Sequence, residues 1–152
     1  MEECRLAPVV IVNKTFSYSE LPFLYQAVDA FVLPSRGEGW GLPLLEAMAT
    51  ALPTVGTNWS GNTEFMKEEN SFLLNYQLRN VSSRKKSSSS SPHLAWREQE
   101  EEEEARHMWA EPSLGHLVEI LQLVRTDPEE RGRRGREGRR QVASRFSHRA
   151  VA

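Results

Sequence analysis

One run, from Phe31 to Ala49, constrains the fold of this chain more than any other feature of the sequence. Its first three residues are apolar and partly β-branched, which is typical of a buried parallel strand, and Pro34 stops the strand. A glycine-rich loop follows. Pro43 suits the first position of a helix, which we expect to continue to Thr50. The run therefore predicts a strand, a tight loop and a helix, the unit from which parallel α/β sheets are built.

The loop between this strand and helix has features that favour an anion. Three glycines at alternate positions of residues 37–41 allow positive φ angles and let a ligand approach the backbone closely. The helix would begin beside the loop, so the amides of Trp40, Gly41 and Leu42 would lack helical partners. Those amides and the positive end of the helix dipole predict a phosphate-binding site.

The residues on either side of this run alternate between strand and helix patterns. We expect strands at Pro8–Val12, Ala30–Pro34, Thr54–Gly56 and Phe72–Leu74, and helices at Ser19–Ala27, Pro43–Thr50 and Asn62–Glu68. This order predicts a parallel sheet with helices on both faces. Ligands bind such sheets beyond the carboxyl ends of the strands, where residues 35–42 and 57–63 would meet. A second helix start, at Ser60, Gly61 and Asn62, would add backbone amides or a side-chain amide to that site.

The second half of the chain begins with a segment of low complexity. Residues 82–106 combine serine runs with a block of glutamates and cannot bury enough apolar surface to form a core, so we expect a disordered insertion. An isolated acidic helix near residues 98–106 is the alternative. Beyond it, apolar residues recur at helical spacing from Leu114 to Val124, which predicts a packed helix. A second helical segment, 129–149, carries eight arginines and is weakened by three glycines.

The strand, loop and helix resemble the retaining glycosyltransferases of the GT-B fold, family 4, whose signature is two glutamates separated by seven residues. Here that pair is Glu38 and Glu46. The segment LPTVGTNWSGNTEFM, residues 52–66, resembles the family's next strand and donor-side loop, and residues 20–35 resemble the helix and strand before the motif. Two later segments, 110–121 and 145–150, are similar to its closing helices.

This resemblance implies an α/β fold, a partial doubly wound Rossmann-like sheet of the kind found in the second, donor-binding domain of a GT-B enzyme. The chain would then divide into a Rossmann-like portion at 1–78, a linker or insertion at 79–106 and C-terminal helices at 107–152. A GT-B enzyme has a further, N-terminal domain that binds most of the acceptor. That domain would be missing from this chain or supplied separately.

The resemblance also assigns roles to residues. Glu38 would contact hydroxyls of the donor sugar at the catalytic centre, and Glu46 would hold the ribose, because an ionised carboxylate accepts hydrogen bonds from vicinal hydroxyls. Trp40, Gly41 and Leu42 would receive the diphosphate. The implied reaction transfers a sugar from a nucleoside diphosphate sugar to an unidentified acceptor hydroxyl, with retention at the anomeric carbon and with no metal or other cofactor.

Composition bounds the setting and the partners. A lone Cys4 gives no disulfide framework and favours a reducing cytoplasm. No apolar run approaches the roughly 18 residues that span a bilayer, although contact with a membrane surface remains open. The arginines of 129–149 are interleaved with glycines and lack regularly spaced aromatic residues, so nucleic acid is a disfavoured binding partner. Two alternatives stand: a catalytically inactive nucleotide-sugar-binding remnant, and a basic-tailed interaction protein that uses the fold without its site.

Overall fold

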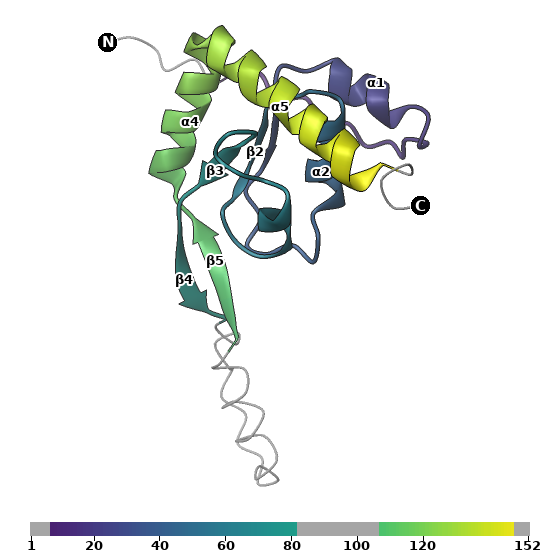
Figure 1. Ribbon diagram of the computed structural model, residues 1–152. Helices are drawn as coiled ribbons and strands as arrows, with labels where there is room; N and C mark the ends of the chain where they lie inside the picture. Colours follow the sequence, from purple (N-terminus) through teal and green to yellow (C-terminus); the bar gives the residue numbers. More distant parts are fainter. Residues whose placement is uncertain (1–6, 82–106, 148–152) are drawn as a thin grey trace, which may run out of the picture.

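A computed structural model describes residues 7–81 and 107–147 and shows a three-stranded parallel sheet (Figure 1). Strands β1 (Phe31–Leu33), β2 (Thr54–Thr57) and β3 (Phe72–Leu74) lie in that order, with Val32 opposite Val55 and Gly56 opposite Leu73. Helix α1 (Leu21–Gln26) precedes β1, and α2 (Leu42–Ala49) joins β1 to β2. The predicted parallel α/β architecture is therefore confirmed.

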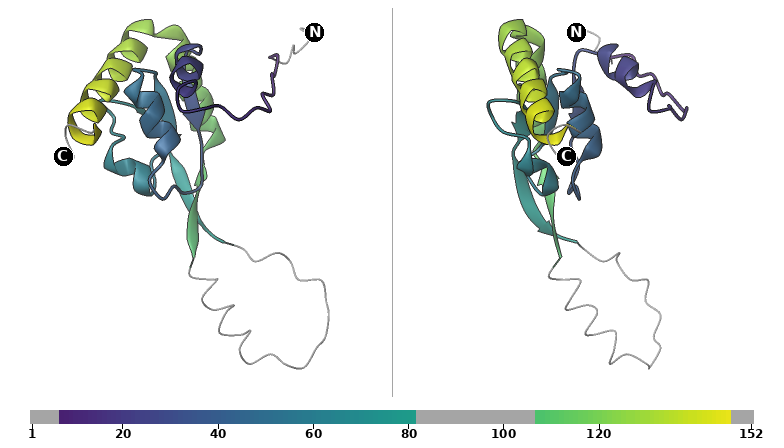
Figure 2. Two further views of the ribbon diagram at one scale, coloured as in Figure 1. Left: turned by 90° about the vertical axis from the view of Figure 1, so that its right-hand side faces the viewer. Right: turned by 45° about the vertical axis from the view of Figure 1, so that its right-hand side comes forward.

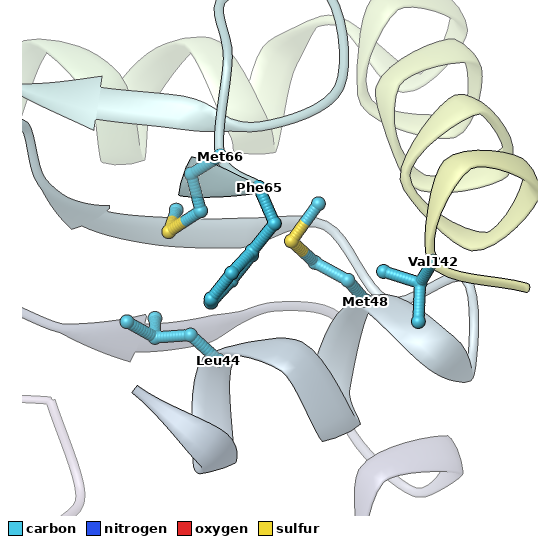
Figure 3. Packing of buried hydrophobic residues seen from close by; sticks show 5 residues of the cluster. All are labelled: Leu44, Met48, Phe65, Met66 and Val142. Carbon is cyan, nitrogen blue, oxygen red and sulfur yellow. The ribbon is translucent and has the colours of Figure 1, made fainter. Parts of the chain in front are cut away.

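Helices cover both faces of this sheet, as expected. Helix α4 (Leu114–Thr126) lies on one face and α2 and α5 (Pro128–Phe146) on the other. Figure 3 shows the core on the α2 side, where side chains from α2, α5 and the segment before β3 point toward one another: Leu44, Met48, Phe65, Met66 and Val142. The α4 side has its own cluster: Val55, Phe72, Leu74, Ile120 and Val124. Burying apolar side chains of this size contributes about 1.5–3 kcal/mol each.

Two glycines that lower the helix propensity of α5 let this helix approach the rest of the protein. Gly135 and Gly138 are both buried. A Cβ atom on Gly135 would overlap the carbonyl oxygen of Ala51, and one on Gly138 would lie 3.0 Å from the carbonyl oxygen of Asn70. Packing therefore maintains a continuous helix of 19 residues despite its composition. Neither α5 nor any other described helix is long and apolar enough to cross a membrane.

Several arginines of α5 bind groups of the protein itself. The Arg134 guanidinium donates to the carbonyl oxygen of Ser71 (2.8 Å) and lies 4.6 Å from the ring centre of Phe72. Arg139 donates to the carbonyl oxygen of Ala49 (2.8 Å). These contacts use positive charge to dock the helix. They direct these two guanidinium groups toward the protein itself, and the interaction-protein alternative stays a prediction.

Acid should destabilise helix α5, because Glu130 pairs with two arginines of the same helix. Glu130 accepts hydrogen bonds from Arg133 (2.7 Å) and Arg134 (2.6 Å), which lower the pKa of Glu130 from its ordinary 4.5 to about 2. A carboxylate with a depressed folded-state pKa stabilises the fold above its unfolded pKa and loses that contribution as pH falls through the folded value. We expect the melting temperature to fall from about pH 4.5 toward pH 2. Circular dichroism should show a shallower acid dependence in Glu130→Gln, and an unchanged profile would contradict the expectation.

The strand expected over Pro8–Val12 is not formed. These residues have no regular secondary structure, and the side chains from Val9 to Val12 are between 60% and 87% exposed. An isolated strand has no neighbour to receive its backbone hydrogen bonds, and β1, at the edge of the sheet, does not pair with this segment. Apolar β-branched composition alone therefore gave a wrong prediction here.

The helix expected over Asn62–Glu68 is also shorter than predicted. Only a single 3-10 turn, η1 (Gly61–Glu64), forms. The side chain of Asn62 donates to the carbonyl oxygen of Thr57 (2.9 Å), and Asn70 Oδ1 accepts from the backbone amide of Lys67 (2.7 Å). Such side-chain bonds to the backbone compete with helix formation.

A pair of antiparallel strands was not predicted. Strand β4 (Tyr76–Asn80) pairs with β5 (Met108–Pro112), with Leu78 opposite Ala110, and we call this pair the β4–β5 ribbon. Figure 2 shows the ribbon projecting from the body of the protein. Residues 79 and 80, expected to begin the linker, end β4. The expected disordered insertion over 82–106 and the alternative acidic helix lie outside the described residues.

Candidate functional site

The loop after β1 becomes helix α2 at Gly41. This residue has a φ of 88°, a left-handed conformation that favours glycine, and it is the only loop glycine with a positive φ. No side chain caps α2, and the amides of Trp40, Gly41 and Leu42 donate to no group among the described residues. The start of α2 therefore presents uncompensated donors and the positive end of its dipole. The predicted phosphate site depends on this property.

A second loop, residues 58–63, lies directly against the first. The Gly61 amide and the Ser60 hydroxyl both donate to the carbonyl oxygen of Glu38, at 3.0 and 2.7 Å. Ser60 has a φ of 77°, a strained value for a residue other than glycine. A Cβ atom on Gly61 would overlap the carbonyl oxygen of Gly39. The second loop thus fixes the backbone of Glu38 in the first loop.

Gly61 and Asn62 lie beside the first loop, but protein groups accept from the Gly61 backbone amide and from the Asn62 side-chain amide. The Gly61 amide binds Glu38, and Asn62 Nδ2 binds the carbonyl oxygen of Thr57 (2.9 Å). Asn62 is 1% exposed, and its Oδ1 has no partner among the described residues. Its Cβ lies 3.1 Å from the position that a Cβ on Gly41 would take. Both residues pack against the first loop, and their contact with a ligand stays a prediction.

Glu46 is the fifth residue of α2 and lies beyond the first turn. An acid in the first turn would merely complement the helix dipole, and that explanation does not apply to Glu46. The Tyr25 hydroxyl of α1 donates to Glu46 Oε2 (3.0 Å). Burial and this hydrogen bond raise the pKa of Tyr25 to about 12, so the hydroxyl remains a donor at neutral pH. Glu46 Oε1 accepts no hydrogen bond from the described residues. One carboxylate oxygen is therefore held in place and the other is available to a ligand.

A pocket of about 340 Å³ opens beside Glu46, with walls from α1, α2, α5 and the segment before α1. Tyr18, Leu21 and Tyr25 supply apolar surface, and Arg139 adds a charge on the α5 side. This volume lies at the lower end of the range for small-molecule pockets. Glu38 does not line the pocket. The structure thus groups Glu38, Gly41, Gly61 and Asn62 at the loops and places Glu46 one helical turn further along α2.

Trp40 joins the site to the core. Its ring centre lies 5.8 Å from those of Phe65 and Phe146, and the residue is 38% exposed. The side chain therefore packs over the end of the core, while the backbone amide remains at the start of α2. The Leu42 side chain, by contrast, is 59% exposed.

The chemistry of the site comes from separate carboxylates and backbone donors. In the described ranges, no three His, Cys, Asp or Glu side chains gather closely enough to hold a metal ion. Carboxylates such as Glu38 and Glu46 accept hydrogen bonds from hydroxyls, and backbone amides donate to anions. No sequence pattern marked Tyr25, and its contribution is visible only because α1 lies against α2.

Comparison with known proteins identifies the family. The family model described as glycosyl transferases group 1 matches residues 1–81 of the 152. A curated relative, the D-inositol 3-phosphate glycosyltransferase of Corynebacterium urealyticum, is 32% identical over 133 residues. The match covers 85% of this chain and 31% of the relative. The chain thus spans about a third of that relative's length.

Solved structures show the same fold. Sucrose-phosphate synthase from Thermosynechococcus elongatus superposes with a TM-score of 0.61 and 20% identity, covering 90% of this chain and 26% of that one. The C-terminal domain of a glycosyl transferase group 1 family protein, LpcC from Francisella tularensis, gives 0.56 and 20% identity, covering 90% and 53%. At this identity the likeness concerns the fold, which confirms the Rossmann-like expectation. The family-model match over more than half of the chain shows that it belongs to the glycosyl transferases group 1 family.

Proposed function

We propose that this chain binds a nucleoside diphosphate sugar and forms the donor side of a retaining glycosyltransferase of family 4. The observation that carries the proposal is the uncapped start of α2, which lies between Glu38 and Glu46. Family membership supports transfer of a sugar from an activated donor. The donor domain role, the retention of configuration and the residue roles below are our proposals.

The dimensions of α2 suit such a donor. Leu42 and Glu46 are four residues apart, which is about 6 Å along a helix axis. A diphosphate at the amides of Gly41 and Leu42 would therefore leave its ribose near Glu46, whose orientation Tyr25 fixes. The adjoining pocket of about 340 Å³ would receive the remainder of the nucleoside.

The reacting end of the donor would lie on the Glu38 side of the loop. There the carboxylate accepts hydrogen bonds from hydroxyls of the donor sugar, and the amides at the start of α2 stabilise charge on the leaving diphosphate. The acceptor hydroxyl would come from a molecule bound mainly by an N-terminal GT-B domain outside these residues. The coverage of only 31% of the curated relative supports this requirement.

Ligand-observed NMR on the purified chain tests donor binding. Uridine, guanosine and adenosine diphosphate sugars would be compared, with the matching free sugars as controls that lack the diphosphate. We expect saturation transfer to at least one nucleotide sugar and to none of the free sugars. A chain that binds none of the three nucleotide sugars would refute the proposal.

An inactive donor-binding remnant is the main alternative. Hydrolysis of the bound donor by this chain, measured as release of nucleoside diphosphate, would favour the transferase, because a remnant binds the donor without turnover. A salt-sensitive affinity for polyanions without donor binding would instead indicate the interaction protein.

A further inference from the structure

Arg36 links the first loop of the site to the β4–β5 ribbon. We propose that Arg36 and Glu111 form a clamp of two positioning residues, which holds the loop that carries Glu38 in its ligand-binding conformation. This inference rests on the proposed function, since it assigns a role within the same site. It identifies the ribbon, an element without a predicted counterpart, as part of the binding machinery.

Three consecutive residues of β5 contact Arg36. Its guanidinium donates two hydrogen bonds to Glu111, from Nε to Oε2 (2.7 Å) and from Nη2 to Oε1 (3.2 Å). It also lies 4.5 Å from the ring centre of Trp109. The Ala110 amide donates to the carbonyl oxygen of Arg36 (3.0 Å). Side chain and backbone of one loop residue are therefore both fixed, only two positions before Glu38.

The alternation of β5 explains why these contacts converge. Side chains at successive positions of a strand point to opposite faces, so Trp109 and Glu111 share one face and Ala110 has the other. Ala110 is fully buried, which anchors this part of β5. The planar guanidinium can stack on an aromatic ring and pair with a carboxylate at once. The hydrogen bonds from Arg36 lower the pKa of Glu111.

The ribbon also reaches the second loop of the site. Trp59 of that loop packs against Tyr76 of β4, with ring centres 5.4 Å apart. The Ser113 amide donates to the carbonyl oxygen of Asn75 (2.8 Å), which ties the two ends of the ribbon together at its base. The first loop, which carries Glu38, and the second loop, which binds the Glu38 carbonyl, thus both contact the β4–β5 ribbon.

The exposure of the ion pair separates local positioning from global stability. The Arg36 side chain is 52% exposed and that of Glu111 is 35% exposed. Pairs this accessible contribute little to the stability of a whole protein. Loss of the pair should therefore free the loop while the sheet and both cores remain folded.

Hydrogen–deuterium exchange on the full chain tests the clamp without any ligand. In Glu111→Gln we expect the amides of Ala110 and Gly61, which donate to the carbonyl oxygens of Arg36 and Glu38, to exchange roughly fivefold to tenfold faster. This is the size expected for losing a bidentate charge-assisted pair near the surface. Exchange in β2 and β3 and the melting temperature should stay at native values. Arg36→Gln should have at least as large an effect, because it also removes the contact with the Trp109 ring. The double variant should be no worse than Arg36→Gln alone, because that variant already removes the ion pair.

Glu137→Gln is the matched control. It breaks another exposed bidentate pair, in which Arg140 donates to Glu137 at 2.8 and 2.6 Å, within α5. This control should leave the exchange of the Ala110 and Gly61 amides unchanged. Equal acceleration in the control, or native exchange in Glu111→Gln, would overturn the clamp.

Affinity for the nucleotide sugar identified in the binding panel gives the second readout. We expect its Kd to rise by a similar factor in Glu111→Gln and to stay native in Glu137→Gln. If Glu111→Gln accelerates exchange but leaves that Kd native, the positioning role is wrong while donor binding stands. If no nucleotide sugar binds the native chain, the proposed function fails, and the exchange data still decide whether the clamp holds the loop.

Discussion

Gly135→Ala should lower the free energy of unfolding by about 1–3 kcal/mol, the usual range for a group forced into a packed interior. The added methyl group would overlap the carbonyl oxygen of Ala51, a backbone atom that cannot rotate away. Helix α5 would have to move from the turn after α2 and would disturb the contacts that Val142 makes in the core. The loss should occur although alanine is the better helix former.

Gly132→Ala provides a matched comparison on the same helix. At this position a Cβ would meet only the end of the flexible Arg136 side chain, at 3.0 Å. Helix propensity should then decide the outcome, and the variant should gain about 0.5–1 kcal/mol. Urea denaturation of both variants measures the difference. If Gly135→Ala were stabilised as much as Gly132→Ala, the close approach of α5 to residue 51 would be wrong.

The parts of the fold that the sequence predicted are those with a local signal. β1, α2, β2 and β3 each combine an apolar run with a proline, a glycine or a polar boundary, and all four form close to the expected residues. Residues 8–12 have the same apolar composition but no partner strand, and pairing partners are not a local property. The β4–β5 ribbon shows the reverse case. Its two strands are separated by residues 81–107, so no short turn pattern predicted that they pair.

The same distinction applies to the site. The positions of Glu38, Gly41 and Glu46 follow from one continuous stretch of chain, and a motif can therefore indicate them. Tyr25 and Glu111 reach this stretch from other elements, one from α1 and one from β5. Neither has a sequence pattern that reports its neighbour. Tertiary packing alone shows which groups orient the motif.

Glu46→Ala should weaken binding of the nucleotide sugar by roughly 10- to 150-fold. This factor corresponds to about 1.5–3 kcal/mol for one charge-assisted hydrogen bond. The Tyr25 hydroxyl, at 3.0 Å, already orients the native carboxylate. The Glu46 side chain therefore loses little conformational freedom when a ribose hydroxyl donates to its other oxygen. The variant loses that acceptor and leaves Tyr25 without its partner. Isothermal titration calorimetry with the nucleotide sugar from the panel measures the change in Kd.

Two further variants test whether the effect of Glu46→Ala comes from lost charge alone and how much of it comes from the orientation that Tyr25 gives the carboxylate. Glu119→Ala removes one negative charge from the exposed side of α4, on the opposite face of the sheet, and should leave the Kd unchanged. Tyr25→Phe keeps the carboxylate but removes the hydroxyl that holds it, so it should weaken binding less than Glu46→Ala does. The ordering of the three variants follows from the geometry of a fixed acceptor at one turn from the start of α2. A Kd in Glu46→Ala that matches the value in Glu119→Ala would remove Glu46 from the site.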